Sequence, residues 1–203
     1  MQAEAGTSLT PSQRAVDPEG GSESATPGRR RRILVWVLVV VAGAAYVGDR
    51  LSKQWVLDHL VEGQVRGFAG PVLRFQLTHN SGAAFSLGTG ATWVFTVIAS
   101  VVAVVIVVLA RRVGSLGWAL ALGLLLGGCL GNLTDRLFRP PGFGRGEVVD
   151  FLQLSFWPTF PIFNVADSSV VSAAVLIALL ALSGIGLDGA RTVGRPRSAQ
   201  ADA

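Results

Sequence analysis

The chain has 203 residues, of which 50% are hydrophobic and only 15% are charged, and its mean hydropathy is +0.52. These values argue against a soluble domain and indicate an integral membrane protein. The pI of about 10.5 does not indicate a nucleic-acid-binding protein, because the sequence has no basic patch interleaved with stacking aromatic residues.

A polar tail is the first predicted element. Residues 1–28 are rich in Ser, Glu, Pro, Gly and Ala and have no periodicity, which predicts a disordered cytoplasmic segment. The arginines and the apolar run that follow, up to Ala42-Gly43-Ala44, also have the form of a cleavable signal sequence. The apolar run continues past this motif into a charged cluster, which favours a retained helix. Residues 191–203 are predicted to be a second disordered tail.

Between the tails, four stretches are long and apolar enough to cross a bilayer. About twenty residues of helix, at a rise of about 1.5 Å each, cover the roughly 30 Å hydrocarbon core. The spanning structure must be helical, because strand-like stretches are too few for a closed barrel. The chain is therefore predicted to be an all-α membrane protein in which residues 29–190 form one domain. Its expected spans are residues 33–52, 91–110, 116–134 and 163–187.

Clusters of arginine predict the orientation of these spans. They lie at Arg29–Arg32, at Arg111 and Arg112, and from Arg191 to Arg197. Four spans place the three clusters on one side of the membrane, and the positive-inside rule makes that side cytoplasmic. Both termini are therefore expected in the cytoplasm, and the loops that follow the first and third spans are expected to face outward.

Two segments of the outer loops have the pattern of strands. Leu73–Thr78 alternates apolar and polar residues, and Val148–Trp157 is also strand-like. We expect a small amphipathic sheet on the outer leaflet, with a turn and an apolar hook at His79–Phe85. His59 and His79 are predicted to be loop residues, and they lack metal-ligand spacing with carboxylates or cysteine.

The third span leads from a face of small residues to a polar cluster. Glycines at positions 123, 127 and 131 recur every four residues, which favours close contact with another helix. Asp135 follows on the same face, with Asn132 and Arg136 beside it. A structural ion pair between Asp135 and Arg136 explains these charges as well as a catalytic role does. The second span has no polar face and is predicted to be a packing helix.

The first and fourth spans carry polar faces at the same outward end. Asp49 and Lys53 are four residues apart on the first span, a spacing that favours a structural pair. Lys53 is nevertheless the only lysine in the chain, which indicates a position that needs a compact ammonium group. On the fourth span, Asn164, Asp167 and the serines that follow share one face.

Asp150 and Asp167 are the strongest candidates for catalysis. Both lie in or next to apolar stretches, and neither has a basic residue at helical spacing. An ionisable group at membrane depth is energetically costly and therefore indicates a function. Two such carboxylates can share one proton and activate water for the hydrolysis of a peptide bond.

These clusters coincide with the motifs of a known family. Asp49–Lys53 and Asn80–Phe85 are followed by three more blocks, which are Gly131-Asn132-Leu133-Thr134-Asp135-Arg136, Val148-Val149-Asp150-Phe151 and Phe163-Asn164-Val165-Ala166-Asp167-Ser168. In this order the five blocks resemble the signature of bacterial lipoprotein signal peptidase, or signal peptidase II. The resemblance covers about residues 33–187.

The resemblance implies an aspartic endopeptidase of the bacterial cell membrane with its active site near the outer face. Such an enzyme removes signal peptides from prolipoproteins and cuts on the N-terminal side of a diacylglyceryl-modified cysteine. By motif position its catalytic pair is Asp150 and Asp167. Supporting or substrate-binding residues would be Asn80, Asn132, Asp135, Arg136 and Asn164, together with Asp49 and Lys53. No metal or organic cofactor is implied, and a monomer is the expected state.

The sequence departs from the family in its long N-terminal tail and in an expanded segment at Arg139–Gly146. Two other classes of protein also have to be weighed. A small proton- or ion-coupled transporter would carry intramembrane carboxylates, but near the midplane and often with internal repeats. A membrane scaffold would leave Asp150 and Asp167 without a purpose.

Overall fold

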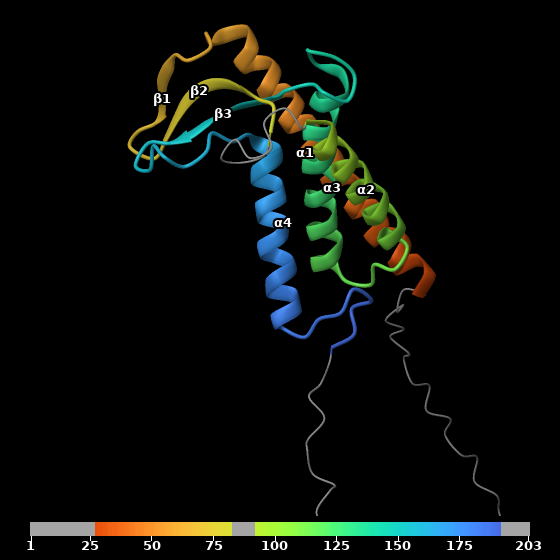
Figure 1. The fold of residues 1–203 in the computed structure, drawn as a ribbon. Helices are drawn as coiled ribbons and strands as arrows, with labels where there is room; N and C mark the ends of the chain where they lie inside the picture. The colour runs from red at the N-terminus through yellow and green to blue at the C-terminus, as the bar shows by residue number, and fades with distance from the viewer. Residues whose placement is uncertain (1–26, 83–91, 192–203) are drawn as a thin grey trace, which may run out of the picture.

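The computed structural model describes residues 27–82 and 92–191. Four helices and a three-stranded sheet follow one another along the chain (Figure 1). In chain order they are α1 (Pro27–His59), β1 (Val65–Ala69), β2 (Leu73–Asn80), α2 (Thr92–Ala110), α3 (Leu116–Phe138), β3 (Val148–Leu154) and α4 (Val165–Leu182).

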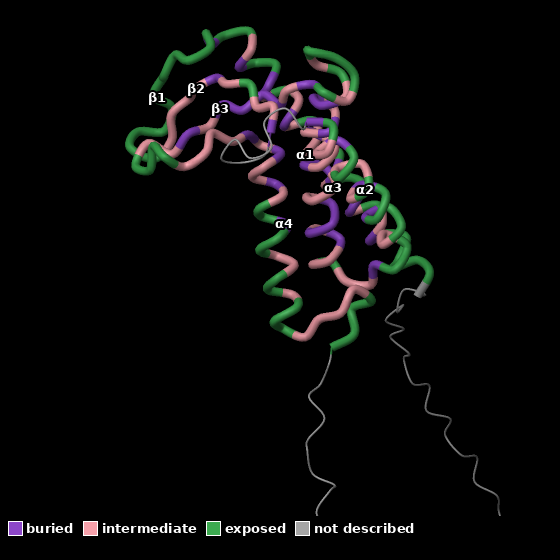
Figure 2. Tube along the Cα trace, viewed as in Figure 1, coloured by how far each residue is buried: buried purple, intermediate pink, exposed green. Residues whose placement is uncertain are grey.

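All four helices are long and apolar enough to cross a membrane, so the predicted fold class is confirmed. The central helix is α3, which packs against α1, α4 and α2. Buried residues run along α3 and into the sheet, whereas much of α2 and α4 is exposed (Figure 2). Exposed valines and leucines on those helices are what lipid contact requires, and the protein is therefore a multi-pass membrane protein.

Two neighbouring glycines let α3 approach a different helix on each side. A Cβ on Gly127 would lie 2.5 Å from the carbonyl oxygen of Ala42 in α1. A Cβ on Gly128 would lie 2.5 Å from the carbonyl oxygen of Ala166 in α4. The predicted small-residue face does contact another helix, because the nearest atoms to glycines 123, 127 and 131 belong to α1.

The sheet has the order β1-β2-β3, is antiparallel throughout, and lies at the end of the bundle opposite the two ends of the described chain (Figure 1). Thr78 in β2 pairs with Asp150 in β3, after an irregularity in register that begins at Phe75. Under the sheet, Val56 of α1 packs with Leu77 and Val149. These contacts fix the sheet on the C-terminal end of α1.

The observed bounds differ from the expected ones where polar residues are buried. The helix α1 runs to His59 because Asp49 and Lys53 face the protein interior, so their charge does not end the helix. At α4 the helix begins at Val165 because Asn164 is its N-cap. His59 ends α1 and His79 lies in β2, so the prediction that they are loop residues was wrong.

Several expectations fall partly or wholly outside the described residues. They concern the two tails and the apolar hook after Gly82. Only the ends of the predicted tails enter the described part of the chain, because α1 already begins at Pro27 and Arg191 forms a bridge with Ile185.

Replacing Gly127 by valine is expected to destabilise the bundle by about 1–3 kcal/mol, because the new side chain has to displace the backbone of α1. The change is measured as a lower midpoint of thermal unfolding of the protein in detergent. Gly43→Val is the matched control, since a Cβ at Gly43 in α1 meets nothing within 4 Å. Equal midpoints for the two variants would contradict the close contact between α1 and α3.

Candidate active site

Asp150 and Asp167 come from different elements and line the same cavity, which has a volume of about 640 Å³. Asp150 lies in β3, and Asp167 lies in the first turn of α4. The polar part of the cavity lining also includes Asn80, Asn132 and Arg136. The candidate pair therefore lies where the sheet meets the end of the helix bundle.

The carboxylate of Asp150 is held by two asparagine amides. Its Oδ1 accepts a hydrogen bond of 2.6 Å from Nδ2 of Asn164, and its Oδ2 accepts one of 2.9 Å from Nδ2 of Asn80. Burial, together with the negative charge of Asp167, raises the pKa of Asp150 to about 7. This carboxyl group can therefore hold a proton near neutral pH.

Asp167 is held by the residue that begins its own helix. Its Oδ2 accepts from the backbone N–H of Asn164 at 3.1 Å, while its own N–H donates to Oδ1 of Asn164 at 2.9 Å. This reciprocal pair is a capping box, which satisfies N–H groups that a helix start leaves unpaired. The other oxygen, Oδ1, accepts from Nδ2 of Asn132 at 2.7 Å.

A buried ion cluster lies behind the cavity. The ammonium of Lys53 is 2.8 Å from Oδ2 of Asp49 and 2.8 Å from Oδ2 of Asp135, and all three side chains are 0% exposed. Oδ1 of Asp135 also accepts from Arg50 and from Arg139, each at 2.6 Å. The side chains of Asp49, Lys53 and Asp135 do not line the cavity.

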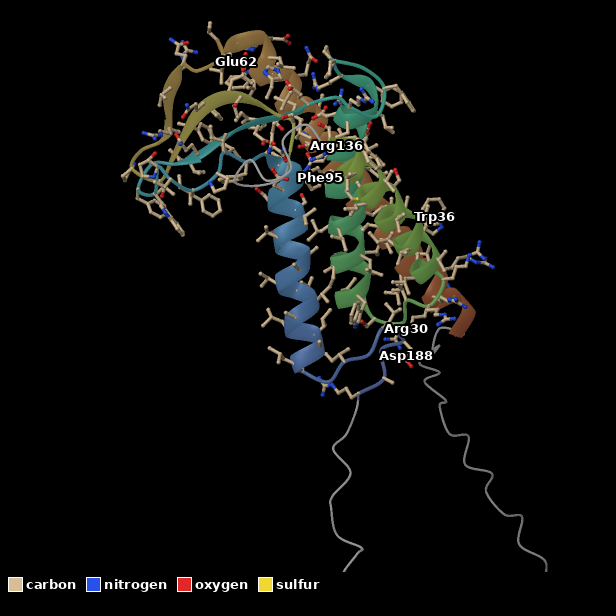
Figure 3. The ribbon with its side chains drawn as sticks, viewed as in Figure 1. Arg30, Trp36, Glu62, Phe95, Arg136 and Asp188 are labelled. Atoms are coloured by element: carbon tan, nitrogen blue, oxygen red, sulfur yellow. The ribbon has the colours of Figure 1, made fainter. Side chains whose placement is uncertain are left out.

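The sequence left open an ion pair between Asp135 and Arg136, and the structure gives these residues different partners. Neighbouring residues of a helix point in different directions, which explains why the two charges separate. Nη2 of Arg136 donates to the carbonyl oxygen of Gly82 at 3.1 Å, and its guanidinium lies 5.8 Å from the ring centre of Phe95 (Figure 3). Nε of Arg136 has no hydrogen-bond partner among the described residues, which leaves a buried donor beside the cavity.

The helix α2 does more than pack, contrary to the sequence-based expectation. The hydroxyl of Thr92 donates to the carbonyl oxygen of Ser81 at 2.5 Å, and that of Thr96 donates to the carbonyl oxygen of Gly144 at 2.9 Å. The second contact fixes the expanded segment after α3 on the bundle. Threonine is β-branched and packs within an apolar helix as valine does. The sequence therefore did not reveal that these hydroxyls bind other segments of the chain.

An apolar wall of the cavity was also missed by the sequence analysis. It follows β3 and includes Phe160, Pro161, Ile162 and Phe163, opposite Val170 and Val171 of α4. The aromatic and proline residues after Trp157 were the available signal, but no periodicity marks them as the lining of a site.

Within the described residues, no three His, Cys, Asp or Glu side chains are grouped so as to hold a metal ion.

Comparison with known proteins gives relatives along most of the chain. A lipoprotein signal peptidase of Leifsonia xyli subsp. xyli is 48% identical over 155 residues, which are 76% of this chain and 71% of that one. A lipoprotein signal peptidase of Mycolicibacterium smegmatis is 45% identical over 188 residues, or 92% of this chain and 76% of that one. Both relatives are matched over more than two thirds of their own length.

A solved structure agrees with these relatives. It is a bacterial membrane enzyme determined by the in meso method at 2.3 Å resolution, with a TM-score of 0.65 and 27% identity. The match covers 72% of this chain and 88% of that one. These findings do not support the alternative of a small transporter. The family described as signal peptidase (SPase) II matches residues 40–183, and the chain therefore belongs to the signal peptidase II family of membrane peptidases.

Proposed function

We propose that this peptidase removes signal peptides from prolipoproteins, with Asp150 and Asp167 as its catalytic pair. The observation that carries the proposal is that two carboxylates from separate elements line one cavity and that all four of their oxygens accept hydrogen bonds from asparagine groups. The relatives named lipoprotein signal peptidase supply the substrate class.

Hydrolysis by such a pair needs one proton shared between two carboxyl groups. The ionised carboxylate accepts a proton from water as the water oxygen attacks the carbonyl carbon, and the protonated carboxyl donates its proton to the carbonyl oxygen. The C–N bond then breaks, the amine nitrogen takes a proton from the pair, and a new carboxyl terminus forms. The asparagine amides hold both aspartates in position throughout.

The shape of the cavity suits a lipid-modified peptide. Its polar end holds the pair, whereas apolar side chains such as Leu154, Phe160 and Val171 line much of the remainder. The lining continues along α4 to Ser172, more than one helical turn from Asp167. We infer that the diacylglyceryl-modified cysteine lies next to this apolar wall and that the bond cut lies on its N-terminal side.

The positions of charged residues support an orientation in the membrane. Arg30 lies at the end of the bundle opposite Glu62 and the sheet (Figure 3). With the positive-inside rule, that end is cytoplasmic and the aspartate pair lies near the outer face. The described residues of a single chain supply both aspartates and their asparagine partners, so we infer that the enzyme acts as a monomer.

Substitution of either aspartate by asparagine is expected to reduce kcat by at least about 1,000-fold, because each change removes a proton-transfer group and keeps the shape. The double variant should lose little more than either single variant, since the two groups act as a unit. Cleavage of a diacylglyceryl-modified prolipoprotein by the purified protein measures the effect. Asp58→Asn, at an exposed position of α1, is the control. Near-wild-type turnover in Asp150→Asn or Asp167→Asn would refute the assignment.

Activity is expected to fall as the pH rises through about 7, the pKa of Asp150. Below that pH the pair keeps one proton, and above it the pair loses the acid that protonates the substrate. We therefore expect kcat/KM to decrease by about tenfold per pH unit well above this value. A pH profile of prolipoprotein cleavage checks this, and an unchanged rate between pH 7 and pH 9 would argue against a protonated Asp150.

A reporter fused after Ala203 is expected to read as cytoplasmic, and one inserted at Gly142 is expected to read as external. Gly142 is exposed, and nothing lies within 4 Å of where its Cβ would be, so an insertion is tolerated there. A reporter with opposite responses on the two sides, such as alkaline phosphatase against a fluorescent protein, makes the measurement. Identical readings at the two positions would show that the spans are miscounted.

A further inference from the structure

Three asparagine amides hold the aspartate pair, and each amide must be turned the right way to donate. Backbone N–H groups fix two of them. Oδ1 of Asn80 accepts from the N–H of Gly82, and Oδ1 of Asn164 accepts from the N–H of Asp167, each at 2.9 Å. Since the oxygen of each amide is thus occupied, the NH₂ group of each faces Asp150.

The third amide, that of Asn132, is oriented by a charged side chain. Its Oδ1 accepts a hydrogen bond of 2.9 Å from Nζ of Lys53, and a weaker one of 3.1 Å from Nδ2 of Asn164. An ammonium group has only donors. The amide cannot turn over without placing its NH₂ group against the ammonium, so its Nδ2 must face Asp167.

Lys53 is itself buried among oxygen atoms. Its ammonium donates to Oδ1 of Asn132 at 2.9 Å and forms ion pairs of 2.8 Å with Asp49 and with Asp135. Asp49 also accepts from the backbone N–H of Ala166 at 2.9 Å, next to Asp167 in the chain. The lysine, its acceptors and the start of α4 therefore form one rigid arrangement.

We propose that Lys53 is a positioning residue that acts through Asn132 to keep Asp167 ionised, as the group that accepts the proton from water, while the shared proton stays on Asp150. This inference rests on the function proposed for the pair. The ammonium polarises the amide whose N–H donates to Asp167. Asp167 also lies in the first turn of α4, where the helix dipole favours a negative charge. Asp150 lies in a strand and contacts the start of α4 through the side chain of its N-cap, Asn164, whereas Asp167 belongs to the helix itself.

Other charged groups also act on the two aspartates. Arg136 lines the same cavity as both of them and so favours an ionised carboxylate at either position. In the described part of the chain α2 carries no ionisable side chain, and Asp167 is the only one in α4. The remaining ionisable groups on the elements that pack around Asp167 lie on α1, α3 and β3. They are Arg29–Arg32, Tyr46, Asp49, Arg50, Lys53, Asp58 and His59 on α1, Cys129, Asp135 and the C-cap residue Arg139 on α3, and Asp150 on β3.

The test compares two variants of the full-length enzyme in detergent, Asp49→Asn and Asp49→Asn with Lys53→Met. The second differs from the first only by the ammonium, and it removes one charge of each sign from the wild type. We expect kcat to fall about 100-fold between them, with KM within about twofold, because Lys53 is buried and is not part of the cavity lining. The acidic limb of the pH–rate profile should move to higher pH by about one unit.

A second variant covers the case in which the lysine substitution prevents folding. Asn132→Asp keeps an acceptor for Lys53 but presents an oxygen, instead of an N–H, to Asp167. It should show the same loss of kcat and the same displaced acidic limb. A lysine that only stabilised the fold would change the unfolding midpoint and the yield of active enzyme, with an unchanged pH profile. That result in either comparison overturns the proposal, whereas an active Asp150→Asn would instead overturn the proposed function.

Discussion

The ammonium of Lys53 lies at the centre of a set of contacts that connects the elements around the candidate site. Its acceptors lie on α1 and α3, and one of them, Asp135, also accepts from the backbone N–H of Val149 in β3 at 3.4 Å. Through Asp49 the same cluster reaches the first turn of α4. Three helices and a strand are therefore connected through one buried ion cluster. The two elements that carry the catalytic candidates, β3 and α4, are among them.

Burial of these charges inside the protein is tolerable only because each has partners. A lone charge out of water would be very unfavourable, and removal of one member of a buried pair typically costs about 3–5 kcal/mol. Lysine suits this position because its compact head donates in three directions, whereas arginine presents a flat fork. This explains why the only lysine of an arginine-rich chain lies at the centre of the cluster.

Much of this arrangement can be predicted from sequence, and the reasons for the failures are physical. Hydropathy identifies the four helices, and helical spacing places Asp49 with Lys53 and the glycines on one face. Spacing within one helix says nothing about partners on another, so the contacts of Lys53 with α3 were not foreseen. The role of Asn80 depends on the register of β2 against β3, including its irregularity, which no local pattern encodes.

The N-cap of α4 links the start of this helix to the geometry of the candidate site. Asn164 begins the helix through its capping box, and the same side chain donates to Asp150 and to Asn132. A helix start has unpaired N–H groups that attract a carboxylate, so the group that stabilises the helix is also one of the two candidates for catalysis. The site is therefore complete only when α4 has formed and packed on α3. Gly128 makes that contact possible, because any larger residue there would meet the backbone of Ala166.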